Sequence, residues 1–256
     1  MDVNNEYGAL DVQKRLLRLL KEFDAFCIAN EIKYSVIGGT LLGAIRHQGF
    51  IPWDDDLDII VDRTNYNKII RLLPDGCLAL EQDRKISLWI DRIKLARDKD
   101  SESLYEFIDV FVLDNCPDNP FIASLKLFLV KILQGMIKPC PKFGEIPFLL
   151  TLLSFILYGL GRFFSYKTKM RMYQRLSVWG NGKNTRLKKI YNDEYSLLSK
   201  CYPGDILNSL IRLPFEDCEV YSIEKYDEYL KYIFGNYMIL PDESKRHPIH
   251  KYLWNL

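Results

Sequence analysis

Four carboxylates lie within five residues of this sequence, where residues 54–58 read Asp-Asp-Asp-Leu-Asp. Carboxylate oxygens are ligands that hard divalent cations prefer, and negative charges this close repel one another unless a cation neutralises them. Asp56 and Asp58 stand two positions apart at the head of an apolar run, so on a strand they point to the same face. We therefore expect Asp56 and Asp58 to hold a divalent cation, with Asp54 a better further ligand than Asp55 because it lies on their face.

A glycine turn precedes these carboxylates. Gly38-Gly39-Thr40 follows a short β-branched run and opens a helix-like segment over residues 40–47. Glycine lets the backbone approach a phosphate closely, and the exposed amides of a helix start attract negative charge. We expect Gly38, Gly39 and Thr40 to bind a phosphate group that faces the metal site.

A single carboxylate interrupts a later apolar run, residues 104–113, whose composition predicts a strand. Between Ile108 and Val110, Asp109 is costly to bury unless it is paired or binds a metal. A phosphoryl-transfer site uses such a third carboxylate to complete the metal shell or as a general base. The alternative is a structural role, facing water or paired with a basic neighbour.

Basic side chains gather near the C-terminus, at Lys245, Arg246, His247 and His250. A basic, turn-rich segment of this kind can fold over a phosphorylated substrate. A solvated tail explains the same pattern, and the spacing alone favours that interpretation.

The overall charge excludes one class of partner. Lys and Arg total 35 against 34 for Asp and Glu, so no global field attracts nucleic acid, and phosphate recognition must be local. The six cysteines form no C-x-x-C pair, and the first twenty residues resemble neither a signal nor a transit peptide. These features predict free thiols in a reducing cytosol.

Several flanking elements can be predicted from periodicity and breakers. Residues 10–30 carry apolar side chains at three- and four-residue steps and predict a helix that packs on a sheet. Further elements are a helix over residues 65–73, a strand over 86–96, and a helix over 223–234 that ends at Gly235.

The middle of the chain is strongly apolar, over residues 121–137 and 146–164. The second stretch has no acidic residue and one basic residue, Arg162, and by length it is at the lower edge of a membrane span. Three interpretations stay open: two buried helices of an insertion, a hairpin that dips into one leaflet, and a true span. The basic residues that follow suit anionic headgroups or an ordinary solvated helix face: Lys167, Lys169, Arg171 and Arg175.

The block GGTLLGAIRHQGFIPWDDDLDI, residues 38–59, resembles the signature of the LicD family, which includes bacterial phosphocholine transferases and fukutin-type enzymes that transfer polyol phosphates. Segments similar to the family's follow in family order: FIDVFVLD, LPFEDCEVYSIEKYDEYL and GNYMILPDESKRHPIH. The resemblance covers both ends of the chain and omits the apolar middle. Two departures are Asn236, where the family often has aspartate, and Val112, where it usually has proline.

The resemblance implies an α+β fold of the nucleotidyltransferase type, with a mixed sheet flanked by helices and a mostly α-helical apolar insertion. It implies a catalytic core over residues 1–118, the insertion over 119–180, and a segment over 181–256 that packs back on the active site. The residues that match the family's motifs are Gly38, Gly39, Asp56, Asp58, Asp109, Arg46 and Lys245 to His247.

The implied activity is metal-dependent transfer of phosphocholine, or a similar phospho-alcohol, from a CDP-choline-like donor, with Mg²⁺ or Mn²⁺ as cofactor. The implied acceptor is a hydroxyl of a cell-surface glycan or its lipid-linked precursor, in lipopolysaccharide or capsule biosynthesis. Such an enzyme is expected in the cytoplasm at the inner face of the membrane, in peripheral contact with it. Two alternatives stay open: a nucleotidyltransferase that uses an NTP on a small molecule or protein, and a membrane-bound scaffold with a vestigial site.

Overall fold

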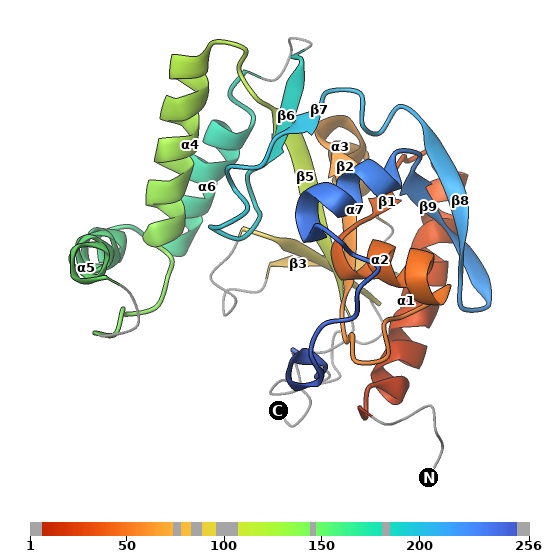
Figure 1. Cartoon of the computed structure of the whole chain (residues 1–256). Helices are drawn as coiled ribbons and strands as arrows, with labels where there is room; N and C mark the ends of the chain where they lie inside the picture. Colours follow the sequence, from red (N-terminus) through yellow and green to blue (C-terminus); the bar gives the residue numbers. More distant parts are fainter. Residues whose placement is uncertain are drawn as a thin grey trace. The chain divides into compact units, whose positions relative to one another are not determined.

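The computed structural model describes residues 7–73, 78–82, 89–95, 107–143, 147–180 and 185–249. They form an α+β fold, as predicted, with the elements labelled in Figure 1. The chain divides into two compact units. The first comprises Met1–Glu81, Asp91–Phe111 and Asp205–Leu256, and the second comprises Gln82–Ile90 and Val112–Gly204.

The main sheet follows the order β1-β2-β5-β4-β3. Its bounds are β1 (Ser35–Val36), β2 (Leu57–Asp62), β3 (Leu78–Gln82), β4 (Asp91–Leu95) and β5 (Ile108–Asn115). β1 is antiparallel to β2, and β4 is antiparallel to β5 with Arg92 opposite Asp109. The strands predicted over residues 86–96 and 104–113 correspond to β4 and β5, which start later than predicted, at Asp91 and Ile108. Residues 83–88 and 96–106 lie outside the described residues.

The helices of the first unit are α1 (Leu10–Ala29), α2 (Gly38–His47), α3 (Arg63–Leu72) and α7 (Tyr226–Phe234). α1 buries the predicted apolar face, including Leu16 and Phe23. α3 starts two residues earlier than predicted because the Asp62 side chain accepts a hydrogen bond from the Asn65 N–H and caps the helix. α7 starts later than predicted because the residues before it form a strand.

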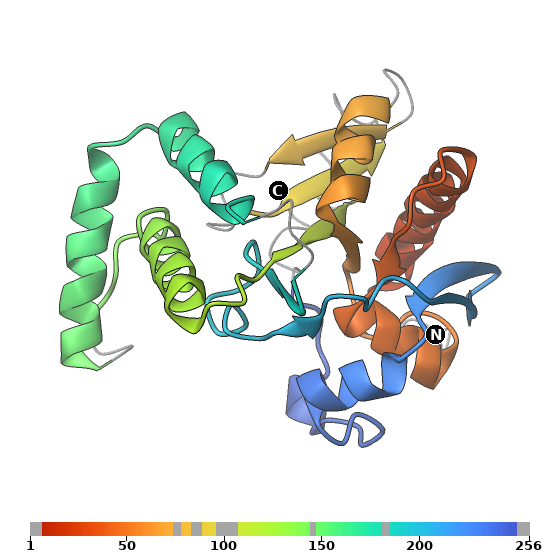
Figure 2. The same ribbon diagram turned by 90° about the horizontal axis from the view of Figure 1, so that it is seen from above.

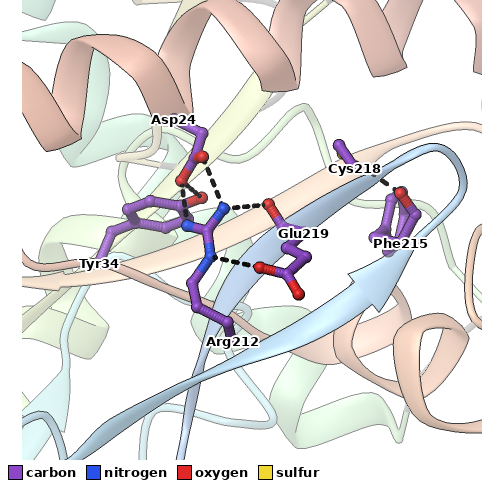
Figure 3. Close-up of polar contacts among 6 residues, drawn as sticks. All are labelled: Asp24, Tyr34, Arg212, Phe215, Cys218 and Glu219. Carbon is purple, nitrogen blue, oxygen red and sulfur yellow. Dashed lines mark hydrogen bonds and ion pairs between the residues drawn. The ribbon is translucent and has the colours of Figure 1, made fainter.

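That strand belongs to a hairpin of β8 (Leu210–Phe215) and β9 (Cys218–Ile223). Arg212 of β8 donates two hydrogen bonds to the Asp24 carboxylate on α1, at 2.7 and 2.9 Å, and the Tyr34 hydroxyl donates a third at 2.7 Å (Figure 3). Two parallel N–H···O bonds fix the guanidinium geometrically as well as electrostatically. The hairpin is therefore fastened to α1.

The second unit contains α4 (Pro120–Gly135), α5 (Phe148–Arg162), α6 (Tyr166–Ser177), β6 (Leu187–Ile190) and β7 (Tyr202–Pro203). The end of β5 pairs with β6, and β6 pairs with β7, both antiparallel. Helices α4 and α6 pack around a core in which Trp89 stacks on Tyr173 with ring centroids 5.0 Å apart. Both predicted apolar stretches are helices.

Lys126 is the least expected core residue of α4. Its side chain is fully buried, and its Nζ donates hydrogen bonds of 2.8–2.9 Å to the carbonyls of Asn115, Ser177 and Trp179. The ammonium also lies 4.2 Å from the centre of the Tyr191 ring. A buried charge is tolerated when its hydrogen bonds are satisfied, so this lysine ties α4 to the strand before it and to the end of α6.

Candidate active site

The glycine turn at the start of α2 lies directly against two of the clustered carboxylates. A Cβ atom added to Gly38 would stand 2.7 Å from Oδ2 of Asp58, and one added to Gly39 would stand 2.7 Å from Oδ2 of Asp54. Gly38 also has a φ of +56°, a conformation that favours glycine. Glycine is therefore required at both positions for the two carboxylates to approach the helix start.

Thr40 and Ile37 fix the backbone of Asp58. The Asp58 N–H donates to the Thr40 hydroxyl at 2.9 Å, and the Ile37 N–H donates to the Asp58 carbonyl at 3.1 Å. Thr40 is buried, so its hydroxyl positions the aspartate. The Gly38 N–H donates to the Tyr229 hydroxyl of α7 at 3.4 Å, which brings α7 to the glycine turn.

Asp54 is electrostatically the most perturbed residue of the cluster. Burial raises the pKa of its carboxyl well above the usual range, and the charges of Asp56 and Asp55 raise it further. The nearby Asp56 carboxyl group thus acts on the pKa of Asp54 in the same direction as burial. Oδ2 of Asp54 is buried and has no hydrogen-bond partner in the described part of the chain. A bound cation would satisfy this oxygen, because carboxylate oxygens are ligands that hard divalent cations prefer.

The Asp55 side chain contacts the C-terminal segment. Its residue exposure is 2%, and Oδ1 accepts a hydrogen bond from the Ile249 N–H at 3.2 Å. Asp54, Asp55 and Asp56 lie before β2 (Leu57–Asp62), so the strand alternation predicted for them is wrong. The preference for Asp54 over Asp55 agrees with their contacts, because Asp54 faces the glycine turn and Asp55 holds the C-terminal segment.

Asp109 lies on β5, the strand next to β2, and is bound by arginine. Arg92 Nε donates to Asp109 Oδ1 at 2.8 Å, and the guanidinium lies 3.5 Å from the centre of the Phe107 ring. Among the described residues, which include Asp54, Asp56, Asp58 and Asp109, no three His, Cys, Asp or Glu side chains are placed so that they could hold a metal ion together. The ion pair is the structural alternative that the sequence left open, and a role for Asp109 as metal ligand or base stays a prediction.

Arg46 lies within electrostatic reach of Asp54, and Arg246 lies near Arg46. Burial lowers the pKa of Arg46, the positive charge of Arg246 lowers it further, and the negative charge of Asp54 opposes both. Arg46 Nη1 donates to the Tyr237 carbonyl at 3.2 Å. The Arg246 guanidinium lies 5.8 Å from the centre of the Trp53 ring, and its Nε donates to the Pro241 carbonyl at 2.9 Å.

The other residues of the basic C-terminal segment are more open to solvent. Lys245 ends a 3-10 helix (Glu243–Lys245), and both Lys245 and His247 are exposed. His250 lies outside the described residues. The structure therefore gives Arg246 a fixed place near Arg46, and the binding roles predicted for Lys245 and His247 stay predictions.

Glu216, which sequence reasoning did not assign to the site, holds the loop between α2 and β2. Its N–H donates to the Gln48 carbonyl at 2.7 Å, and its Oε1 accepts from the Phe50 N–H at 3.0 Å. Gln13 of α1 holds the next part of the loop by donating to the carbonyls of Ile51 and Asp54. The signal for Glu216 was its place inside LPFEDCEVYSIEKYDEYL, one of the segments similar to the family.

Part of the sequence matches a known protein family. Residues 31–114 match the family described as LicD/FKTN/FKRP, nucleotidyltransferase domain. The chain is 28% identical to a lipopolysaccharide cholinephosphotransferase LicD of Haemophilus influenzae, over 91% of this chain and 92% of that protein.

Two rickettsial proteins share a shorter segment. An uncharacterized protein of Rickettsia prowazekii is 46% identical over 59 residues, 23% of this chain and 22% of that protein. A second, from Rickettsia typhi, is 47% identical over 58 residues, 22% of this chain and 19% of that protein. The matched region contains the glycine turn, the carboxylate cluster and Asp109, so residues 31–114 of this chain are similar to the nucleotidyltransferase domain of the LicD family.

Proposed function

We propose that this protein is a transferase that moves phosphocholine, or a closely similar phospho-alcohol, from a CDP-linked donor to a hydroxyl of lipopolysaccharide or another cell-surface glycan. The main support is the similarity to a cholinephosphotransferase over nine-tenths of both chains. The second support is the pair of carboxylates, Asp54 and Asp58, held against a glycine turn whose amides suit a phosphate.

In this proposal, Asp54, Asp56 and Asp58 hold Mg²⁺ or Mn²⁺, with Asp109 as a further candidate ligand. The bound ion would neutralise the negative charge of the donor diphosphate. The glycine turn would place its backbone against that diphosphate, and Arg46, which interacts electrostatically with Asp54 and Arg246, would add positive charge there. Most of the catalysis would come from positioning and charge neutralisation, as in other phosphoryl transfers.

Asp109 is the group that we assign to the acceptor. It orients the acceptor hydroxyl and takes its proton while the hydroxyl oxygen forms a bond to the phosphorus of phosphocholine. The bond between that phosphorus and the bridging diphosphate oxygen breaks, and CMP leaves with the electron pair. Arg92 fixes the carboxylate by its hydrogen bond of 2.8 Å. Lys245 and His247 are exposed in the unliganded protein and would contact the donor if the basic segment closes over it.

A dual-label experiment separates this function from its alternatives. Purified protein is incubated with glycan acceptor, Mg²⁺ and either choline-labelled CDP-choline or base-labelled NTPs. We expect choline label on the acceptor together with an equal amount of free CMP. Nucleotide label on the acceptor would instead show nucleotidyl transfer, and label from neither donor would support the scaffold alternative.

Glu216 is expected to act as a positioning residue. Glu216→Ala removes the acceptor for the Phe50 N–H and frees the loop that leads to Asp54, so we expect kcat to fall about a hundredfold, the scale at which small misplacements act. Glu216→Gln keeps an oxygen acceptor at the same place and should restore most of the activity. Equal loss in both variants, measured as CMP release, would show that the charge matters instead of the hydrogen bond.

A further inference from the structure

Helix α5 exposes apolar side chains on most of its surface. Only Thr151 and Gly161 of its fifteen residues are buried, while Phe148 is 70% and Leu149 75% exposed. The helix lies beside α4 at the edge of its unit (Figure 2). Soluble monomers rarely expose contiguous apolar patches of this kind, which mark interaction surfaces.

Helix α4 adds a second apolar strip. Its large exposed residues recur at one-, three- and four-residue steps, which places them on one face: Phe121, Ile122, Leu125, Phe128 and Leu129. The opposite face of α4 packs into the core through Val130 and Leu133. We call the exposed residues of α4 and α5 together the apolar surface.

The part of the chain that carries the apolar surface is mostly basic. Residues 119–177 contain nine lysines and arginines and a single acidic residue, Glu145, although the whole chain is nearly balanced. On α6, the exposed residues Lys167, Arg171 and Arg175 recur every four residues and so form a basic stripe. Lys126 is the member of the basic group that is fully buried.

The lengths of these helices show whether they could span a lipid bilayer. α5 has 15 residues, about 22 Å at 1.5 Å per residue, whereas a bilayer core is about 30 Å thick. No single helix in the described ranges has the length and hydropathy of a membrane span. Helices α5 and α6 have that length and hydropathy only when they are taken together, and this pair is bent by 110°. The basic stripe of α6 would have to enter hydrocarbon in that arrangement, which is costly.

We propose that the apolar surface of α4 and α5 docks in the interfacial layer of an anionic membrane, with α5 lying in the membrane plane. Apolar side chains enter the headgroup and upper acyl region, and the basic residues of α6 and of the α4–α5 connection contact anionic headgroups. Stable peripheral binding requires an apolar contact together with an electrostatic attraction to anionic lipids. The second unit supplies both. A second copy would instead bring two strongly basic surfaces together. The proposal does not depend on which group the enzyme transfers.

Vesicle flotation of the full-length protein tests the apolar part. We expect binding to vesicles of phosphatidylcholine mixed with phosphatidylglycerol, and a loss of about tenfold or more for Leu149→Glu with Ile156→Glu. Ile28→Glu with Ile70→Glu is the matched control, because these residues are similarly exposed on α1 and α3 and the added charge is the same. Equal binding by both double variants would overturn the proposal, as would absence of wild-type binding.

A second variant and its control test the basic stripe of α6. Neutralising the α6 stripe should weaken binding to the anionic vesicles on the order of a hundredfold. The stripe variant is Lys167→Gln, Arg171→Gln and Arg175→Gln. The control replaces exposed basic residues of the other unit: Lys14→Gln, Lys33→Gln and Arg71→Gln. Equal binding to neutral and anionic vesicles, or a concentration-dependent dimer that Leu149→Glu dissociates in the absence of vesicle binding, would overturn the proposal.

Discussion

Asp58→Asn is expected to reduce phosphocholine transfer by about a thousandfold, the scale on which one electrostatic contact to a transition state acts. The Asp58 carboxylate lies against Gly38, where it would hold the metal that faces the donor diphosphate. Its backbone is fixed by Thr40 and Ile37 through hydrogen bonds that asparagine also makes. The fold should therefore be retained, and initial rates of CMP release measure the effect.

Asp55→Asn is the control for this prediction. It removes the same charge three residues earlier, at a side chain whose Oδ1 contacts the Ile249 N–H. Asparagine keeps an oxygen for that contact, so most of the activity should remain. Substantial activity of Asp58→Asn with CDP-choline would contradict the site assignment, provided that circular dichroism shows both variants folded.

Arg92→Met is expected to lower the free energy of unfolding by about 3–5 kcal/mol, because it leaves a buried carboxylate without its partner. The side chains of Arg92 and Asp109 are only 3% and 10% exposed, and their ion pair joins β4 to β5. The guanidinium also packs on Phe107, so part of the loss is packing. Urea unfolding at neutral pH measures the change.

The double variant Arg92→Met with Asp109→Leu separates structure from chemistry at this pair. Replacing both charges by apolar groups should recover most of the lost stability, because a buried pair contributes little net free energy. It should not recover activity if Asp109 takes the acceptor proton. Full activity in the recovered double variant would assign Asp109 a purely structural role, and unchanged stability of Arg92→Met would show that the pair is not needed by the fold.

The main helices and strands could be predicted because their signals are local. The spacing of Leu16 and Phe23 sets the buried face of α1, and the two glycines with the Asp-x-Asp pattern place α2 and β2. The proximity of the glycine turn to Asp54 and Asp58 followed from the same motif. These features depend on residues within one segment or on a family-wide pattern.

What could not be predicted depends on pairing between distant segments. Asp109 was visible as a costly carboxylate, but its partner Arg92 is defined by the register of β4 on β5. Glu216 reaches the Phe50 N–H across 166 residues, and no periodicity reports such a contact. Lys126 is buried within an apolar helix because three backbone carbonyls from separate segments accept hydrogen bonds from it, and no local pattern reports those partners.

The central claim is that Asp54, Asp56 and Asp58 close around one divalent cation opposite the glycine turn. Titrating Mn²⁺ into the protein with CDP-choline present, followed by electron paramagnetic resonance, tests this most directly. We predict one tightly bound Mn²⁺ per chain in the wild type and in Asp55→Asn, and no tight site in Asp54→Asn or Asp58→Asn. Undiminished Mn²⁺ binding by folded Asp58→Asn would contradict the account.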